Sequence, residues 1–480
     1  MKPANYPTAP AHLWDHFYEI SRLPRPSKQE QRIREYVIGL AESSGHPWRQ
    51  DAAGNVVIYV PASDDMTGRE TVIIQNHLDM VTVKTGDKEH DFTADPLTLE
   101  VEDGWLHADR TTLGADNGLG CSAALALMTD TGISHPPLEL LFTVDEETGL
   151  GGALNLDAEM LSGSHMLNLD TEDWHELYVG CAGGGGWELR RDFVTESVPA
   201  NAECWQLSLS GLAGGHSGIQ IQEQLGNAIK LLGQCLHDVS EVRLAEAEAG
   251  IAHNVIPREG HLLFACPPGT GAELQSRLSD LQAQWLGYLP KDDESLQLML
   301  EPASFEPALS TADTGTVLDV IAALPHGAQA YSLVQRADLV DLSVNLARLE
   351  LRDGALLLET SFRYFNTAQC LPLQQQVLGI ARAFGLKETE LLSYPGWEPD
   401  FDSPLLARAA ELHEQLFGER PAIKAIHAGL ECGILKGKYP DTDILSFGPT
   451  IRGAHSPTER LQIDTVEPFW RFLTALLREL

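Results

Sequence analysis

The stretch TVIIQNHLD, residues 71–79, decides the fold of this chain. Its first five residues are mainly apolar and β-branched, which is typical of a short strand buried on both faces of a parallel sheet. The run ends directly in polar side chains, among them His77 and Asp79. Open α/β sheets bind ligands at the carboxyl ends of their strands. We therefore expect His77 and Asp79 at the ligand-binding edge of such a sheet.

Two later stretches repeat this form. LELLFTV, residues 138–144, is followed directly by the acidic run 145–147, and HMLNLD, residues 165–170, ends at Asp170. Neighbouring parallel strands end at the same edge of a sheet, so the polar side chains of all three stretches should converge there. Residues 117–128, between the first two strands, are small and apolar and predict a helix. Strands that alternate with helices favour an α/β domain.

The sequence pattern changes after the third strand. The run AGGGG, residues 182–186, indicates a hinge or turn, because it lacks the Lys-Ser/Thr of a phosphate-binding loop. Beyond it, alternating polar and apolar residues favour antiparallel strands, and the strand–helix pattern returns near residue 402. The predicted fold is α/β, with a mixed, mostly parallel central sheet flanked by helices over 1–186 and 396–480. An α+β domain is inserted at 187–395.

Composition and charge narrow the class of protein. Hydrophobic residues make up 43% of the 480 residues, enough for buried cores. The formal charge of −36 attracts cations and repels nucleic acid and anionic membranes, so neither is an expected partner. The sequence has no apolar run of roughly 18 residues, and its first residues, MKPANYPTAPAHLWDHF, do not show the apolar stretch expected of a signal peptide. Its seven cysteines form no CxxC pair, which favours reduced thiols in the cytoplasm and leaves His, Asp and Glu as metal ligands.

Histidines and carboxylates far apart in the chain form one candidate metal centre. They are His77, Asp79, Asp116, Asp145, Glu146, Glu147, Asp170 and His455. Two divalent ions about 3.5–4 Å apart can activate a water and polarise a carbonyl, and zinc accepts imidazole and carboxylate donors. Each motif alone also fits an ordinary role, as a capping pair, a solvated acidic turn or a loop histidine. Their joint occurrence favours metal-dependent hydrolysis.

Six motifs occur in order along the chain and carry a family resemblance. They are NHLDMV, TTLGADNG, DEETGLGG, LNLDTED, HAGLECG and SFGPTIRGAHSPTE. Together they resemble the aminoacyl-histidine dipeptidases, also called peptidase D or bacterial carnosinases, within the co-catalytic zinc exopeptidases. The resemblance extends over the whole chain. It implies that the main domain is catalytic and that the inserted domain is a lid through which two chains form a homodimer.

The resemblance also implies roles at the centre. The metal ligands would be His77 and Asp170 at one ion, Glu147 and His455 at the other, and Asp116 as the bridge. Glu146 would be the general base. Asp79 would hydrogen-bond the far nitrogen of His77 and fix its tautomer. In such families the peptide bond after the bridging aspartate is often cis, which makes Asp116–Asn117 the candidate here.

Four further residues are assigned to the substrate by the same resemblance. His216, in GGHSG, would stabilise the oxyanion, and Asn254, in HNVIP, would contact the substrate. Arg363, in TSFRYF, would hold the substrate carboxylate, although this spelling departs from the Arg-Ser-Ser usual in the branch. Glu431, in HAGLECG, would bind the free amino group. Each also has an ordinary interpretation: a glycine turn, a lid loop, a surface strand arginine and a tight helix start.

The leading hypothesis is a two-metal dipeptidase that hydrolyses the peptide bond of short Xaa-His dipeptides such as carnosine. The same site would serve an N-acyl amino-acid amidohydrolase or a tripeptidase, because the metals do not specify the acyl group. A non-enzymatic peptide-binding relative and a two-metal phosphoesterase are further alternatives. The intact base Glu146 argues against the former, and the acidic charge argues against the latter. Zinc is the expected metal, and cobalt or manganese suits the same ligands.

Overall fold

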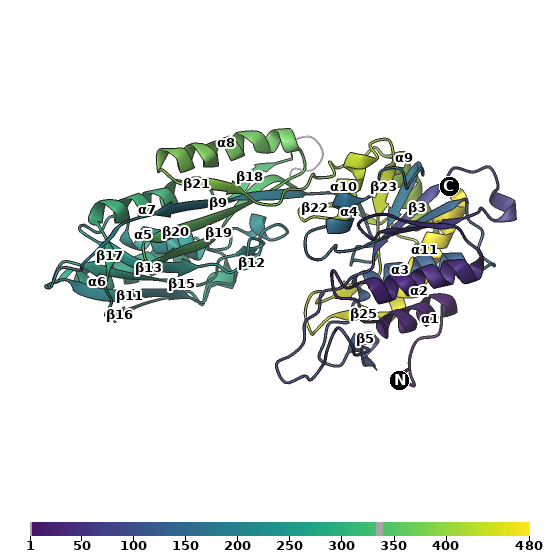
Figure 1. Ribbon diagram of the computed structural model, residues 1–480, viewed down its shortest axis with the longest axis horizontal. Helices are drawn as coiled ribbons and strands as arrows, with labels where there is room; N and C mark the ends of the chain where they lie inside the picture. The colour runs from purple at the N-terminus through teal and green to yellow at the C-terminus, as the bar shows by residue number, and fades with distance from the viewer. Residues whose placement is uncertain (1, 333–338) are drawn as a thin grey trace. The chain divides into compact units, whose positions relative to one another are not determined.

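The computed structural model describes residues 2–332 and 339–480 (Figure 1). Contacts divide the chain into two compact units. The first unit comprises Met1–Cys181, Trp397–Ile426 and Leu430–Leu480, and the second comprises Ala182–Gly396 and His427–Gly429. The domain boundaries expected at residues 186 and 395 describe independently folding domains, which contacts alone do not define. These boundaries stay a prediction.

A mixed, mostly parallel sheet lies at the centre of the first unit and confirms the predicted fold class. Its eight strands, in spatial order, are β1 (Trp48–Gln50), β2 (Val56–Val60), β6 (Leu138–Thr143), β3 (Val72–His77), β7 (His165–Asn168), β23 (Asp443–Ser446), β8 (Glu176–Cys181) and β22 (Ala422–Ile426). The four neighbours β6, β3, β7 and β23 run parallel to one another. Every residue of β3 and β6 is buried, which is why both sequences are so apolar.

Helices cover this sheet. They are α1 (Ala11–Ser21), α2 (Gln31–Ser44), α3 (Ala115–Thr129), α4 (Gly151–Asn155), α9 (Pro404–Phe417), α10 (Glu431–Lys438) and α11 (Val466–Glu479). α11 is amphipathic, because Phe469, Phe472, Leu473 and Leu476 recur at helical spacing and are buried. α3 is instead buried along nearly its whole length, since its small residues allow it to pack against both α1 and β3.

A smaller sheet of the first unit carries the segment with His455. Its order is β24 (Ile451–Arg452), β25 (Arg460–Gln462), β5 (Trp105–Ala108) and β4 (Leu99–Glu102). The short 3₁₀ helices η1 and η4 span Asp64–Met66 and Ile463–Thr465. His455 lies in the connection between β24 and β25, so the pairing of these strands holds both ends of its loop.

The second unit is built on a nine-stranded sheet. Its spatial order is β16 (Gln297–Pro302), β11 (Glu203–Ser210), β15 (Gly260–Cys266), β13 (Arg243–Ala249), β19 (Val340–Arg352), β20 (Ala355–Tyr364), β9 (Gly183–Asp192) and β21 (Lys387–Glu390), with β18 (Gly327–Tyr331) also paired to β19. The pairs are antiparallel, as the alternating sequence predicts. Two short ladders join β10 (Thr195–Glu196) to β17 (Ala308–Leu309) and β12 (Gly215–His216) to β14 (Val255–Ile256).

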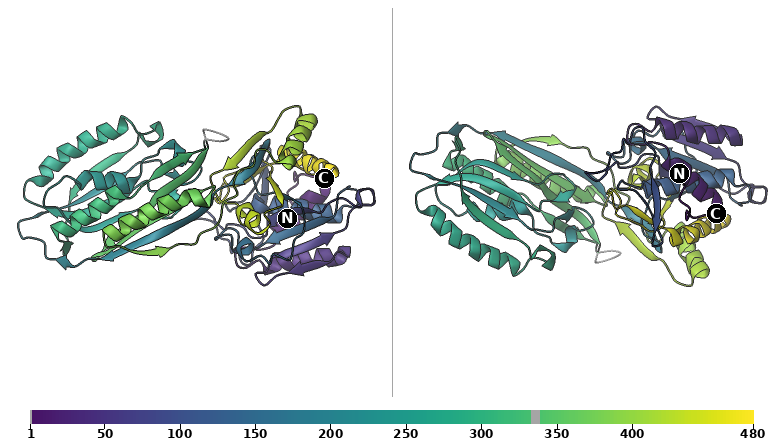
Figure 2. Two further views of the ribbon diagram at one scale, coloured as in Figure 1. Left: turned by 90° about the horizontal axis from the view of Figure 1, so that it is seen from above. Right: turned by 90° about the horizontal axis from the view of Figure 1, so that it is seen from below.

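Four helices lie over one face of this sheet (Figure 2). They are α5 (Ala228–Leu236), α6 (Thr270–Leu286), α7 (Thr311–Ala323) and α8 (Thr367–Ala383), with 3₁₀ helices at η2 (Ile221–Glu223) and η3 (Lys291–Asp293). Buried leucines, valines and Phe264 from these helices and from the sheet form one continuous core. In the described residues of both units, no helix is long and apolar enough to cross a membrane.

The AGGGG run belongs to a strand and is not the turn that its composition suggests, and the boundary between the two units falls at its first residue, Ala182. Gly183 to Gly186 pair with the end of β20 as the first residues of β9. A Cβ at Gly184 would lie 2.6 Å from the Tyr394 hydroxyl, and a Cβ at Gly186 would lie 2.2 Å from the Thr360 carbonyl. The glycines therefore allow close approach of neighbouring backbone and side chain within the sheet.

Candidate metal centre

The three predicted strands end side by side in the first unit. β3 lies between β6 and β7, parallel to both. His77 ends β3, the pair Glu146 and Glu147 follows β6, and Asp170 follows β7. The carboxyl edge of the parallel strands thus brings together an imidazole and acids from three separate segments, as expected for a ligand site of an α/β sheet.

Five side chains at this edge form a continuous run of close contacts. His77 Nε2 lies 2.9 Å from Asp116 Oδ1 and 3.3 Å from Asp170 Oδ1. His455 Nε2 lies 3.2 Å from Asp116 Oδ2 and 3.1 Å from Glu147 Oε2. The two oxygens of Asp116 therefore face different histidines. This arrangement brings all five predicted metal ligands together.

The donor set fits bound divalent ions. The ligand atoms of His77, Asp116 and Glu147 lie within 4.8 Å of one another. Two donors of one tetrahedral zinc ion, each bound at 2.0–2.2 Å, stand about 3.3 Å apart. The separations of 2.9–3.3 Å among the five side chains are of that size. Imidazole nitrogens and carboxylate oxygens are also the donor types that zinc, cobalt and manganese accept.

Negative charge is concentrated here. Burial, aided by the charge of Asp116 and opposed by that of His77, raises the pKa of Asp170 to about 7. Hydrogen bonds to Asp116 and Glu147 raise the pKa of His455 to about 11. Both shifts are consistent with a buried cluster of carboxylates that a nearby positive charge would stabilise. Bound cations would supply it, so the electrostatics agree with the donor chemistry.

Asp79 lies behind His77 and connects two strand ends. His77 Nδ1 is hydrogen-bonded to the Asp79 backbone carbonyl at 3.2 Å and lies 3.5 Å from Asp79 Oδ1. The two carboxylate oxygens of Asp79 accept the backbone N–H groups of Glu146 and Glu147 at 3.1 and 3.2 Å. Ser27 Oγ donates to Oδ2 at 2.7 Å. Burial would raise the pKa of Asp79, but these hydrogen bonds and the charge of His77 lower it to about 2. An ionised Asp79 therefore orients both the imidazole and the acidic loop.

Asp116 enters the site from the first turn of α3. Its backbone departs from helical geometry, and its peptide bond to Asn117 is cis, as the family resemblance leads one to expect. The preceding Gly114 has φ +65°, a left-handed conformation that favours glycine. The TTLGADNG motif is thus a shaped loop that turns the Asp116 carboxylate towards both histidines.

Glu431 is fully buried at the start of α10 in the first unit. Its Oε2 accepts hydrogen bonds from Gln75 Nε2 at 2.6 Å and Thr143 Oγ1 at 2.5 Å. Its Oε1 has no hydrogen-bond partner among the described residues. Burial raises the pKa of Glu431 to about 8. One oxygen of this carboxyl group is therefore buried without a hydrogen-bond partner among the described residues.

The other three predicted substrate residues lie together in the second unit. His216 and Asn254 are joined through their segments, since the Ser217 N–H donates to the Asn254 carbonyl at 2.8 Å. Arg363, on β20, is buried, and its Nη2 lies 3.5 Å from His216 Nε2. Arg363 Nε has no partner among the described residues.

Several residues at these sites were not predicted from the sequence. His427 joins the second unit, where its Nε2 lies 2.8 Å from Ser343 Oγ and its Nδ1 has no partner among the described residues. Arg25 and Glu459 are both buried beside the Asp116 loop. A signal existed for two of them, because His427 opens the HAGLECG motif and Glu459 closes SPTE. Arg25 lies in an ordinary Pro-Arg-Pro segment.

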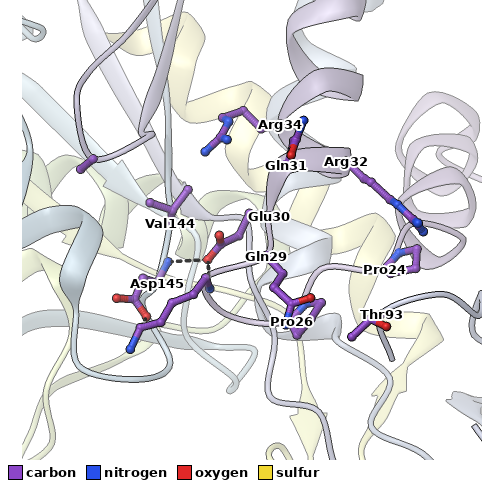
Figure 3. A pocket seen from close by; sticks show the side chains of 12 residues that line it. Pro24, Pro26, Gln29, Glu30, Gln31, Arg32, Arg34, Thr93, Val144 and Asp145 are labelled. Atoms are coloured by element: carbon purple, nitrogen blue, oxygen red, sulfur yellow. Dashed lines mark hydrogen bonds and ion pairs between the residues drawn. The ribbon is translucent and has the colours of Figure 1, made fainter. Parts of the chain in front are cut away.

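A pocket of about 620 Å³ adjoins the acidic loop of the first unit (Figure 3). Glu30 lines it and accepts the backbone N–H groups of Lys28 and Asp145 at 2.7 and 3.0 Å. The guanidinium groups of Arg32 and Arg34 point away from each other (Figure 3). Glu30 therefore fixes the start of the acidic loop, residues 145–147, through the Asp145 N–H group. The two arginines do not direct their positive charges to a common point in the pocket (Figure 3).

Comparison with known proteins places these features in context. The sequence pattern of peptidase family M20/M25/M40 matches residues 73–479. A cytosol non-specific dipeptidase of Escherichia coli (strain K12) is 37% identical over 476 residues, 98% of each chain. The crystal structure of an aminoacylhistidine dipeptidase from Vibrio alginolyticus has a TM-score of 0.87 and 36% identity, and the match covers 98% of this chain and 97% of that one.

A more distant structure shares the fold alone. A tripeptidase from Staphylococcus aureus subsp. aureus mu50 has a TM-score of 0.55 at 14% identity, with 98% of this chain and 97% of that chain covered. The resemblance drawn from the six motifs is confirmed by the family pattern and by the two relatives at 36% and 37% identity.

Proposed function

This chain belongs to peptidase family M20/M25/M40, and from that premise we propose that it is a two-metal dipeptidase acting on short dipeptides, notably Xaa-His of the carnosine type. One observation carries the proposal: the contacts that link Asp170, His77, Asp116, His455 and Glu147, with one carboxylate facing both histidines. The two relatives with identities of 36% and 37% are both named as dipeptidases, which supports the same reaction class.

The metal positions follow from the donors. His77 and Asp170 would hold one ion, Glu147 and His455 the other, and Asp116 both. When bound, two divalent ions polarise a substrate carbonyl and lower the pKa of a water molecule. Zinc is the proposed metal because it accepts both imidazole and carboxylate, and cobalt and manganese take the same donors. Metal analysis of the purified chain identifies which is present.

Glu146 is proposed as the general base and then the general acid. It takes a proton from the attacking water and returns it to the leaving amine nitrogen. Burial, with the charges of Glu147 and Asp170 and against that of His77, raises the pKa of Glu146. A raised pKa brings a carboxyl group closer to the operating pH, where proton transfer in both directions is efficient. The hydrogen bond from the Glu146 N–H group to Asp79 Oδ1 fixes the backbone that carries the Glu146 carboxyl group.

Asp79 is proposed to act through its neighbours. Its backbone carbonyl and its Oδ1 both face His77 Nδ1 and keep the proton on that nitrogen, so that Nε2 presents its lone pair towards Asp116 and Asp170. By accepting the Glu146 and Glu147 N–H groups it also fixes the loop that carries the base. Loss of Asp79 would therefore disturb a ligand and the base together.

Glu431 is proposed to bind a free ammonium group of the substrate, and Arg363 is proposed to bind a substrate carboxylate. Glu431 Oε1 is an acceptor without a partner and would receive the free ammonium group. Arg363 offers an unpartnered Nε–H in a buried setting, where a guanidinium binds a carboxylate strongly. A free dipeptide carries an ammonium group and a carboxylate, and these two side chains offer an acceptor for the former and a donor for the latter.

His216 and Asn254 are proposed to contact the reacting peptide group. The Nδ1 of His216 accepts the N–H groups of Gly218 and Ile219 at 3.1 and 3.2 Å, which places the ring proton on Nε2. An Nε2–H donor can stabilise a developing oxyanion. The hydrogen bond between Ser217 and the Asn254 carbonyl holds the two segments in register.

Parallel substrate assays test the proposal. Carnosine, Ala-His, an N-acetyl amino acid, a tripeptide and a phosphodiester are compared before and after removal of metal by a chelator. We expect hydrolysis of the dipeptides, loss on chelation and recovery when metal is returned. Faster turnover of the N-acetyl compound or the tripeptide would favour the amidohydrolase or tripeptidase alternative. Absence of any peptide hydrolysis would favour a binding protein.

We propose that the enzyme acts in the cytoplasm. We also propose that it forms a homodimer through the second unit. The relative from Escherichia coli is named a cytosol enzyme, and the charge of −36 disfavours nucleic acid and membrane partners. Within the described residues β16 pairs on one side only, and Met299 and Tyr288 near it are 52% and 65% exposed. An open strand edge with exposed apolar side chains suits strand pairing between chains. Light scattering during size-exclusion chromatography measures the oligomeric state.

A further inference from the structure

The carboxylate of Glu459 accepts the backbone N–H groups that lead into Asp116. Oε2 accepts from Leu113 at 2.8 Å and Gly114 at 2.9 Å, and Oε1 accepts from Ala115 at 2.8 Å. Glu459 is only 2% exposed. It also follows His455 by four residues, on the short connection that leads into β25. One side chain therefore ties the Asp116 loop to the segment of a second ligand.

Arg25 binds the opposite side of the same loop. Its Nη1 donates to the carbonyls of Leu78 at 2.8 Å and Asp79 at 2.7 Å, and its Nη2 donates to the Gly114 carbonyl. Arg25 is also 2% exposed. A planar guanidinium has donors in a fixed fork, so it can set the spacing of two backbone segments. Here those segments carry His77 and Asp116.

The glycines of the TTLGADNG motif make room for this arginine. A Cβ at Gly114 would lie 2.4 Å from Arg25 Nη2 and 2.8 Å from Met80 Sδ. A Cβ at Gly118 would lie 2.7 Å from Arg25 Nη2. Both distances are shorter than atoms can approach without a shift. The small residues on either side of Asp116 therefore serve the contact with Arg25 as well as the turn.

We propose that Arg25 and Glu459 are positioning residues of the metal centre, which set the bridging carboxylate of Asp116 relative to His77 and His455. The inference rests on the proposed two-metal function. Neither residue touches a ligand side chain in the described contacts; both act on backbone groups of the ligand segments. Asp116 has to face two histidines at about 3 Å each, so a small rotation of its loop would weaken both contacts. Residues that orient ligands typically contribute about 10–100-fold to metal affinity.

A purely structural role is the alternative, because any buried charged side chain with several hydrogen bonds supports folding. The first unit offers a matched control in Glu139, on β6. Its carboxylate is 4% exposed and accepts the backbone N–H groups of Ser162 at 2.9 Å and Gly163 at 3.1 Å, in a loop that carries no metal ligand. Glu139→Gln removes the same chemistry from a different loop.

The experiment measures zinc affinity of the full-length chain, stripped of metal, by competition with a chelating dye. We expect Glu459→Gln to weaken zinc binding about 10–100-fold, and Glu139→Gln to lower the melting temperature while leaving the affinity within about twofold. Excess zinc should restore part of the dipeptide hydrolysis lost in Glu459→Gln. Arg25→Lys, which cannot span both segments, should weaken zinc binding in the same direction.

The outcomes separate the two ideas. Unchanged zinc affinity in folded Glu459→Gln and Arg25→Lys would overturn the positioning role, and so would an equal loss in Glu139→Gln. If Glu459→Gln does not fold, Glu459→Asp is measured in its place; it keeps the charge but retracts it from the loop, and the same affinity loss is expected. An unaltered chain that binds zinc yet hydrolyses no dipeptide would instead refute the proposed function and leave the positioning role standing.

Discussion

The candidate centre of the first unit and the polar cluster of the second unit satisfy their polar groups in different ways. In the first unit, His77, Asp116 and His455 face one another at 2.9–3.2 Å. In the second, Arg363 Nε, His427 Nδ1 and Ser217 Oγ are buried without a partner in the described part of the chain. An unpaired buried polar group costs about 1–3 kcal/mol. The ligand side chains of the first centre thus face one another, whereas the second cluster holds buried polar atoms that face no partner in the described part of the chain.

The elements that carry the two sites differ in the same way. His77 and Glu147, two of the proposed ligands, lie at or just after the six-residue buried strands β3 and β6, and Asp79 and Glu30 hold the acidic loop by its backbone. His216 and Asn254 lie on or beside the two-residue strands β12 and β14. Longer strands with more backbone pairing hold side chains more rigidly. We therefore expect chemistry to depend on the first set and substrate recognition on the second.

The largest expected effect comes from Glu146→Gln in the first unit. Loss of the base should reduce kcat about 10²–10⁴-fold, while the metal content stays unchanged because none of the five ligands is altered. Steady-state kinetics and metal analysis of the same preparation measure both quantities. If the variant retains its activity, the general base is another residue. The expectation that the chemistry depends on Glu146 in the first unit would then be wrong.

Arg363→Met should produce the next largest effect. Removing a buried partner of a substrate carboxylate costs about 3 kcal/mol, or about 100-fold in kcat/KM for a free dipeptide. A dipeptide with an amidated C-terminus should lose much less, because it lacks the carboxylate. Arg352→Met, on the exposed end of β19, is the matched control and should change neither rate. An equal loss for both substrates would indicate a structural role for Arg363.

His427 predicts a pH dependence of stability. Burial, aided by the charges of Arg363 and His216, lowers its pKa to about 3, whereas an exposed histidine titrates near 6.5. The unfolded chain therefore takes up the proton first as the pH falls. Above about pH 6.5, protonation of His427 does not lower the free energy of unfolding. As the pH falls from 6.5 to about 3, that free energy decreases progressively, by about 2 kcal/mol at pH 5. Urea unfolding at pH 7.5 and 5 should show this loss, and His427→Gln should reduce the difference between the two.

Ser217→Ala should have the smallest effect. The Ser217 hydroxyl is buried and unpartnered, so its removal relieves an unpaired polar group but also leaves a small cavity. Because these two effects oppose each other, the free energy of unfolding should change by less than about 0.5 kcal/mol. Ser122→Ala in the first unit, where the hydroxyl donates to the Gly118 carbonyl at 2.6 Å, should cost about 1 kcal/mol. Chemical denaturation measures both. A larger loss for Ser217→Ala would show that the second cluster is already satisfied without a ligand.

The strand ends were predictable because burial on both faces leaves a plain apolar signature. TVIIQ and LELLFT became β3 and β6, with the polar ligands directly after them. Helix boundaries are harder to predict: α5 begins at Ala228 because the Asn227 side chain accepts the N–H groups of Ile229 and Lys230. A capping residue inside an apolar stretch is easily overlooked in sequence patterns.

Other features could not be predicted because they act through backbone contacts. Arg25 and Glu459 bind carbonyl and N–H groups more than 50 and 340 residues away, and no side-chain pattern marks such partners. AGGGG suggests a hinge by composition, yet close approach of Tyr394 and Thr360 requires its glycines inside a strand. The role of His427 is not visible in the sequence, because its neighbours Ser343 and Arg363 lie on strands far from it in the chain.

The order of strands in the central sheet has a consequence for biosynthesis. β23, residues Asp443–Ser446, inserts between β7 and β8, and His455 follows it. A growing chain that has passed residue 181 thus holds two strands of this sheet with a place between them still empty, while the ribosome adds about 260 more residues at roughly 5–20 per second. His455 is the last of the five proposed ligands to be synthesised. A nascent chain therefore lacks the complete proposed metal centre until β23 and residue 455 have been added.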